Sequence, residues 1–310
     1  MQLTTFIDKI ASPPALKTSM SLHHDAIRIV DTGHRLNPMS SELTLSSPNS
    51  PRKKHSAFMR DVVAATVEGL GTFLFLFAAF GGVNASQTAA GGDSPGAAGA
   101  MMIATSFGLS LLVVAWALYR VSGGLLNPAV TVALVISKAI TPRRGAMFVL
   151  AQLIGAICAA AMVEALFPGP FTGANSLKNA ISVTQAFFLE MILTGLFTLV
   201  ILMLAVEKSR GTFVAPVGIG LALFLVHLVA VPYTGCSVNP ARSLAASIFE
   251  GTWSDHWIFW VAPVLGAVLA SLFHLGIKTF DYETLNPGQD AQNDGEKQWV
   301  TREVEADSDV

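Results

Sequence analysis

The chain has 310 residues, of which 52% are hydrophobic and only 13% are charged, and its formal net charge is −2. Soluble domains carry about 25% charged residues, so this composition and a mean hydropathy of +0.55 exclude an ordinary soluble protein. Apolar runs of about 20 residues recur along the chain, which predicts a polytopic membrane protein. The two cysteines, Cys158 and Cys236, are too few to indicate a disulfide framework.

Residues 1–60 are polar and rich in Ser, Pro and His, which predicts a largely disordered tail. Full membrane spans are predicted after this tail, at approximately 61–82, 99–119, 146–167, 184–206, 213–231 and 256–277. The last segment, 281–310, is acidic and is expected to be solvated. The expected fold class is therefore all-α, with six transmembrane helices in a channel domain over 61–280.

Two short apolar stretches, 127–137 and 239–249, each open on the same tripeptide, Asn-Pro-Ala. Asparagine is a favoured helix cap and proline suits the first helical position, so each tripeptide predicts a helix start. A helix of this length rises roughly 16 Å, about half of a hydrocarbon core roughly 30 Å thick. Two re-entrant half-helices are therefore expected to begin at mid-membrane and to direct positive dipole ends at one place, as in a pore. The motif residues are Asn127, Pro128, Ala129, Asn239, Pro240 and Ala241.

Basic side chains gather in alternate connections between the spans, and the opposite connections carry fewer of them. By the positive-inside rule, the connections with the basic residues face the cytoplasm, and both termini are expected there as well. The residues that set this orientation are Arg120, Lys138, Arg143, Arg144, Lys208, Arg210 and Lys278.

The chain is internally repeated, since the pattern Glu-x-x-x-Thr-x-Leu-Phe begins at Glu68 in the first span and at Glu190 in the fourth. Repeat one is expected over about 61–167 and repeat two over about 184–278. Three spans per repeat is an odd number, so the second repeat is inverted and the functional site is expected at the midplane. Glu68 and Glu190 are expected to brace the re-entrant loops by accepting backbone N–H bonds; a proton relay is the alternative.

Two Asn-Pro-Ala half-helices in inverted three-span repeats resemble the aquaporin, or major intrinsic protein, family over about 61–280. The long N-terminal tail and the string from Ala205 to Lys208 look most like fungal members. The resemblance implies a homotetramer in a lipid bilayer, with one pore per subunit, no cofactor, no metal and no nucleic-acid partner. The plasma membrane is the expected location, with an internal membrane left open.

The resemblance also implies roles for particular side chains. The motif asparagines of the family donate hydrogen bonds to a water molecule at the pore centre, and capping alone is the alternative for Asn127 and Asn239. Likeness to the water-selective branch assigns Phe107, His227, Cys236 and Arg242 to a selectivity ring that passes water and obstructs glycerol. Ordinary packing is the alternative for Phe107. For Cys236 the alternative is a small pore-lining residue without a special role, and its position predicts that mercurials reach it.

Four further positions bear on the branch and on regulation. Ser243 follows Arg242 where glycerol facilitators have Asp, and Phe259 precedes a Trp in a pair those proteins lack. Ser247 departs from the water pattern, which usually has Ala there. Ser122 resembles a gating phosphorylation site of the family, although Ser-Gly-Gly is also a simple turn.

Three other functional classes compete with a channel. Paired carboxylates, metal-ligand spacing and a nucleophile with its base are not recognisable in spans two to six, so an enzyme is not expected. A secondary transporter needs alternating access, often with ionisable coupling groups, whereas the midplane motifs here are Asn, Pro and Ala. An adhesive homologue would conduct little. The sequence predicts passive, bidirectional water transport with proton and ion exclusion; the alternative is a pore mainly for hydrogen peroxide or another small neutral solute, or a gated, poorly conducting homologue.

Overall fold

The computed structural model describes residues 56–91, 96–209 and 211–286. Most of each predicted tail, residues 1–55 of 1–60 and 287–310 of 281–310, lies outside the described residues, as does Arg210. Within the described ranges the chain is all-α, and six helices are long and apolar enough to cross a membrane. The predicted fold class is confirmed.

The helices are α2 (Ala57–Ala89), α3 (Gly96–Leu118), α4 (Pro128–Ile136), α5 (Pro142–Leu166), α6 (Val183–Ile201) with the π-helical turn η1 (Leu202–Val206), the 3₁₀ turn η2 (Thr212–Val214), α7 (Ala215–Thr234), α8 (Pro240–Glu250), α9 (Ile258–Lys278) and the 3₁₀ turn η3 (Tyr282–Thr284).

Helix α2 is longer than the predicted span at both ends. It begins within the segment assigned to the tail, because Ser56 caps it by accepting a hydrogen bond from the Met59 amide at 3.2 Å. It continues past residue 82 to Ala89, because the polar side chains of Asn84 and Ser86 lie buried against neighbouring structure. The apolar stretch ends near these residues, but the helix continues to Ala89.

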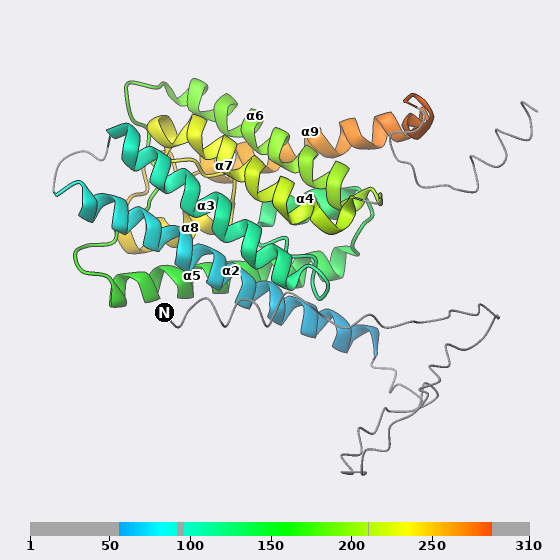
Figure 1. Ribbon diagram of the computed structural model, residues 1–310, viewed down its shortest axis with the longest axis horizontal. Helices are drawn as coiled ribbons and strands as arrows, with labels where there is room; N and C mark the ends of the chain where they lie inside the picture. The colour runs from blue at the N-terminus through cyan, green and yellow to red at the C-terminus, as the bar shows by residue number, and fades with distance from the viewer. Residues whose placement is uncertain (1–55, 92–95, 210, 287–310) are drawn as a thin grey trace, which may run out of the picture. The chain divides into compact units, whose positions relative to one another are not determined.

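The long helices pack in three extensive pairs, α2 with α5, α3 with α7, and α6 with α9 (Figure 1). Small residues permit the close approach within these pairs. A Cβ on Gly155 of α5 would collide with the carbonyl oxygen of Gly69 on α2. The equivalent residue of the second repeat, Gly266 on α9, is as tightly enclosed, since its Cβ would collide with the carbonyl oxygen of Met191 on α6.

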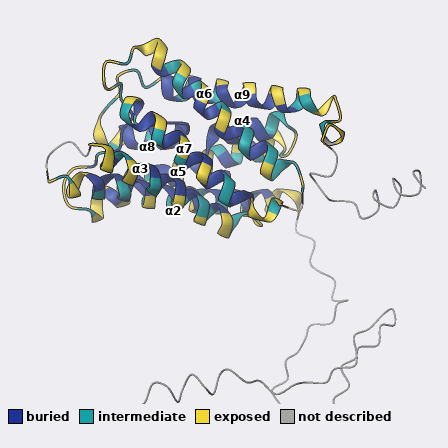
Figure 2. Cartoon of the chain, turned by 45° about the horizontal axis from the view of Figure 1, so that its top comes forward, coloured by how far each residue is buried: buried dark blue, intermediate teal, exposed yellow. Residues whose placement is uncertain are grey.

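Helices α4 and α8 are the two predicted half-helices. Each has its motif asparagine at the N-cap in extended backbone and its motif proline at the first helical position. Helix α4 packs on α5 and α9, α8 packs mainly on α5, and the two half-helices contact each other. Figure 2 shows buried residues on the inner sides of the helices and exposed ones on the outside. The exposed outer residues are largely apolar, as a bilayer-facing surface requires.

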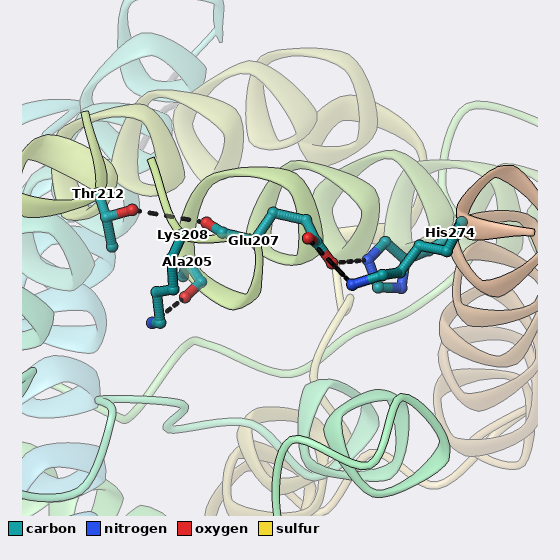
Figure 3. A network of polar contacts seen from close by, with 6 residues as sticks. Ala205, Glu207, Lys208, Thr212 and His274 are labelled. Carbon is teal, nitrogen blue, oxygen red and sulfur yellow. Dashed lines mark hydrogen bonds and ion pairs between the residues drawn. The ribbon is translucent and has the colours of Figure 1, made fainter. Parts of the chain in front are cut away.

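Beyond η1, a polar network joins the ends of α6 and α9 (Figure 3). The Glu207 carboxylate accepts hydrogen bonds from His274 Nε2 at 2.6 Å and from Lys278 Nζ at 2.8 Å. The Glu207 carbonyl lies 3.5 Å from the Thr212 hydroxyl, and Lys208 donates to the Ala205 carbonyl at 2.6 Å. The π-helical turn is therefore held to α9 on one side and to η2 on the other.

Candidate functional site: a pore centre and a filter

The two motif asparagines are linked through each other's backbone. Asn127 Nδ2 donates to the Val238 carbonyl at 2.7 Å, and Asn239 Nδ2 donates to the Leu126 carbonyl at 2.9 Å. Their Oδ1 atoms cap α4 and α8 by accepting from the Ala129 and Ala241 amides. Each side-chain amide has two hydrogens, so one hydrogen on each asparagine remains for a molecule in the cavity that both line.

The backbone turns before the asparagines are strained in the same way. Leu126 has φ 53° and Val238 has φ 43°, in the left-handed region that non-glycine residues rarely adopt and β-branched residues almost never do. Such residues persist only when their surroundings hold them. The strain places each carbonyl within hydrogen-bonding distance of the opposite asparagine.

Two buried carboxylates hold these turns. Glu68 accepts from the amides of Leu125 and Leu126 at 3.0 and 2.8 Å. Glu190 accepts from the amides of Ser237 and Val238, each at 2.9 Å. These are the contacts that a bracing role requires, and both carboxylates are fully buried.

Sequence reasoning missed the side chains that complete each carboxylate's set of hydrogen bonds. Gln152 Nε2 donates to Glu68 at 2.9 Å, and Gln152 also exchanges hydrogen bonds with Thr131 on α4. In the second repeat, the Thr234 hydroxyl donates to Glu190 at 2.6 Å. A glutamine inside a membrane span is costly without a partner, and this was the signal available for Gln152.

Three of the four residues assigned to the selectivity ring come together. Phe107 on α3 and His227 on α7 stack with ring centroids 4.2 Å apart and an interplanar angle of 23°. The Arg242 guanidinium carbon, on α8, lies 5.3 Å from the Phe107 ring centroid. All three side chains are buried.

The candidate filter contains two polar atoms without hydrogen-bond partners in the described part of the chain. His227 Nδ1 lies 2.9 Å from the Leu223 carbonyl, which can only accept, so Nδ1 carries the proton and Nε2 of the neutral ring is an acceptor. Among the described residues, neither His227 Nε2 nor Arg242 Nε has a hydrogen-bond partner. One acceptor and one donor are thus free for a permeant.

Cys236 lies in the loop before the second motif, but it is not among the residues that line the cavity. Its thiol is fully buried and lies 3.6 Å from the Val226 carbonyl. The structure therefore does not bring this side chain into the space shared by Phe107, His227 and Arg242.

A small cavity lies between the filter and the pore centre, with a volume of about 10 Å³. This volume is the space open to the centre of a water-sized sphere, and on this measure a cavity of about 10–15 Å³ holds one water molecule. The walls include side chains that sequence reasoning did not assign to the pore. These are Phe75, Leu111, Leu125, Leu126, Phe197, Leu223, Ser237 and Val238.

Arg242 is held by the connection between α5 and α6, which sequence reasoning also missed. Its Nη1 donates to the Gly173 carbonyl at 2.6 Å and to Asn175 Oδ1, and its Nη2 donates to the Gly235 carbonyl at 3.1 Å. Ser243, next to the arginine, donates to the same Asn175 oxygen at 2.8 Å. The connection carries no motif, so its contribution could not be read from residue spacing.

The other two serines singled out from the sequence, Ser122 and Ser247, also have structural partners. Ser122 is buried, and its hydroxyl accepts from the Gly124 amide at 3.1 Å, which is the turn interpretation. The Ser247 hydroxyl lies 3.0 Å from His256 Nδ1, while Trp260 Nε1 donates to His256 Nε2 at 3.0 Å. Burial lowers the pKa of His256 below 6.5, which favours the neutral ring that this arrangement requires.

Comparisons with known proteins show the family of the chain. The chain matches the family described as Major intrinsic protein over residues 52–274. It is 47% identical over 250 residues to Aquaporin-7 of Botryotinia fuckeliana (strain B05.10), covering 78% of this chain and 55% of that protein. It is 40% identical over 276 residues to Aquaporin-1 of Gibberella zeae (strain ATCC MYA-4620 / CBS 123657 / FGSC 9075 / NRRL 31084 / PH-1), covering 86% of each.

Among solved structures, the chain is similar to the X-ray structure of the aquaglyceroporin from Plasmodium falciparum. The TM-score is 0.61 at 26% identity, over 70% of this chain and 96% of that chain. The chain spans about half the length of several curated relatives that it matches, 55% in the case of the Botryotinia Aquaporin-7. It belongs to the major intrinsic protein family, the family of aquaporin channels, and is a multi-pass membrane protein. The resemblance to fungal aquaporins is confirmed.

Proposed function

We propose that the chain is a water channel, which lets water cross passively in both directions and largely excludes glycerol. The observation that carries this proposal is the cavity of about 10 Å³ beside Phe107, His227 and Arg242. A cavity of about 10–15 Å³ on this measure holds one water molecule, so this space is just sufficient for one water and too small for glycerol.

A water molecule at the filter would donate to His227 Nε2 and accept from Arg242 Nε, the two atoms without partners. At the centre it would accept from Asn127 and Asn239, so both lone pairs would be used and a proton could not be relayed through it. The positive ends of α4 and α8 and the Arg242 charge oppose the passage of cations. Glu68 and Glu190 serve as braces for the turns that place the asparagines.

Glycerol conduction is the competing function, because the structural neighbour is named an aquaglyceroporin. The stacking of Phe107 on His227 narrows the filter and favours water over glycerol. Hydrogen peroxide, close to water in size and hydrogen bonding, is a candidate second permeant. A gated or poorly conducting homologue is the remaining alternative, and the same narrow filter is compatible with it.

The proposed setting follows from the family and from the charge pattern. We place two inverted repeats, about 61–167 and 184–278, in one channel domain, with both termini on the cytoplasmic side of the plasma membrane. A homotetramer with one pore per subunit is the proposed assembly. The basic residues Arg120, Arg143 and Lys278 support this orientation.

The test is stopped-flow shrinkage of proteoliposomes under sucrose and under glycerol gradients, with wild type, His227→Ala and His274→Ala. His274 is a matched control, because it is equally buried but does not line the cavity. Fast water flow, negligible glycerol flow and a glycerol leak only in His227→Ala would support the proposal. Slow water flow that recovers when residues 1–55 are deleted would indicate a closed gate. Slow flow without recovery would contradict a water channel.

A further inference from the structure

The two charged side chains of α8 lie at the helix ends where the helix dipole disfavours them. Arg242 lies in the first turn, where no acidic residue occurs, and Glu250 is the last residue, where no basic residue occurs. Cations are favoured at a helix C-terminus and anions at an N-terminus, so both placements are locally unfavourable. Local rules are typically broken where a side chain serves a contact elsewhere.

Both charges bind the same residue of the connection between α5 and α6. Arg242 Nη1 donates to the Gly173 carbonyl at 2.6 Å, while a single oxygen of Glu250 accepts from the amides of Gly173 and Ala174 at 2.6 Å each. Arg242 and Glu250 are eight residues apart, about 12 Å along the helix axis. Helix α8 therefore holds Gly173 from both of its ends.

The bound segment is buried although it belongs to a connection. Phe171 and residues 173–175 are buried, and the Phe171 ring packs edge-on against Phe80 at a centroid distance of 5.2 Å. A second carboxylate in a C-terminal turn, Glu164 of α5, accepts from the Phe171 amide at 2.8 Å. Asn175, at the far end of the segment, accepts from Arg242. Contacts of Phe171, Gly173, Ala174 and Asn175 therefore hold the segment next to Arg242.

We propose that Glu250 is a positioning residue for Arg242. By binding the Gly173 and Ala174 amides, it fixes the Gly173 carbonyl and the Asn175 side chain, which in turn hold the guanidinium at the filter. Glu250 does not touch the permeant, and it sets the filter width through this segment. The inference deepens the proposed water-channel function and rests on it.

The choice of substitutions follows from the single accepting oxygen. Glu250→Gln retains one carbonyl oxygen and can keep both amide hydrogen bonds without the charge, whereas Glu250→Ala keeps neither. Glu250→Asp keeps the charge but withdraws the oxygen by one methylene. Asp255→Asn is the charge-matched control, because Asp255 lies close by in the chain and its carboxylate bonds only to Ser254 among the contacts described.

The experiment measures water and glycerol permeability of the full chain in proteoliposomes for wild type and these four variants. We expect the glycerol-to-water flux ratio to rise about tenfold in Glu250→Ala and in Glu250→Asp. Glu250→Gln and Asp255→Asn should remain near wild type. In an Arg242→Ala background, Glu250→Ala should add no further leak, because the residue being positioned is gone.

Three outcomes would overturn the proposal. A selective Glu250→Ala variant would show that the contact does not position the filter, and a selective Glu250→Asp variant would show the same if Glu250→Ala does not fold. An equal leak in Glu250→Gln and Glu250→Ala would assign the effect to charge, for example toward Lys178, which the Glu250 charge influences. Additive leaks with Arg242→Ala would place Glu250 on a separate path. If wild type itself fails to conduct water selectively, the water-channel proposal is what falls.

Discussion

Asn127 and Asn239 each donate a hydrogen bond to the carbonyl of the residue just before the other. Each asparagine thus caps its own half-helix with its oxygen and holds the opposite turn with its nitrogen. The two motifs form one unit rather than two similar sites, because neither turn is complete without the other.

This reciprocity predicts energetic coupling between the two asparagines. Asn127→Ala and Asn239→Ala should each lower stability by about 1–3 kcal/mol, since each removes a helix cap and one buried hydrogen bond. The double variant should cost less than the sum by about 0.5–3 kcal/mol, because the second substitution acts on a turn already released. Thermal unfolding in detergent measures the cycle. Additive costs would show that the two turns are independent.

Both oxygens of Glu68 and of Glu190 accept hydrogen bonds from the chain. A glutamine has one acceptor oxygen, so Glu68→Gln and Glu190→Gln each leave a buried amide without a partner, at about 1–3 kcal/mol. We expect the yield of folded protein to fall more than the glycerol-to-water flux ratio changes. Size-exclusion profiles and proteoliposome fluxes measure the two effects. Normal yield with altered selectivity would argue against bracing.

Helix α9 offers a matched pair of glycines. A Cβ at Gly266 would collide with the Met191 carbonyl of α6, while a Cβ at Gly276 would meet no described atom within 4 Å outside its own helix backbone and chain neighbours. Gly266→Ala should therefore destabilise the protein by about 1–3 kcal/mol. Gly276→Ala should be neutral or stabilise it by up to about 1 kcal/mol, because alanine favours a helix. Thermal midpoints in detergent compare them, and equal midpoints would contradict this packing.

The contacts of Glu207 make the stability of the protein depend on pH. Burial alone would raise its pKa, but hydrogen bonds from Lys278 and His274 outweigh that effect, and the pKa of Glu207 is lowered from 4.5. A lowered folded-state pKa means that the contact's full stabilisation is present above the unfolded-state pKa and is lost as the pH falls through the folded-state pKa.

Glu207→Gln should therefore lower stability by about 1 kcal/mol at neutral pH. The difference from wild type should shrink in acid, and thermal midpoints recorded across a pH series measure it. A difference that stays constant with pH would show that the charge of Glu207 is not what matters.

Cys236 lies close to the pore motif in the sequence, but its side chain does not line the cavity. The sequence motif predicts that mercury reaches it, yet its thiol is buried and lies against the Val226 carbonyl. We expect mercuric ion to block water flow slowly, because this contact must first open, and Cys236→Ser should abolish the block. Cys158→Ser is the control, since Cys158 is exposed. A block that survives in Cys236→Ser would show that mercuric ion acts at another site.

Features encoded by local chemistry were predictable. The half-helices followed from an asparagine and a proline at the right spacing, and the spans followed from apolar length. Helix α2 exceeded its predicted bounds because the burial of Asn84 depends on neighbouring helices and not on its own polarity. The left-handed turn at Val238 was equally hidden, since the residue type argues against it and only tertiary contacts hold it.

The support of the filter was the least predictable part. Gly173 and Asn175 lie far from Arg242 in the chain, 69 and 67 residues away, in a segment without periodicity or motif. Glu250 lies one residue beyond the predicted half-helix 239–249, and no motif singled it out. Its contacts depend on how a connection folds back, which no local pattern specifies.

The crossed asparagine bonds also bear on how the protein is made. The acceptor for Asn127 lies 111 residues later in the chain. While the first repeat is in the membrane and the second is not, α4 has its cap, but the Asn127 Nδ2 group lacks its acceptor, the Val238 carbonyl. The centre of the pore is complete only once the second repeat has arrived, so a partly synthesised chain lacks it.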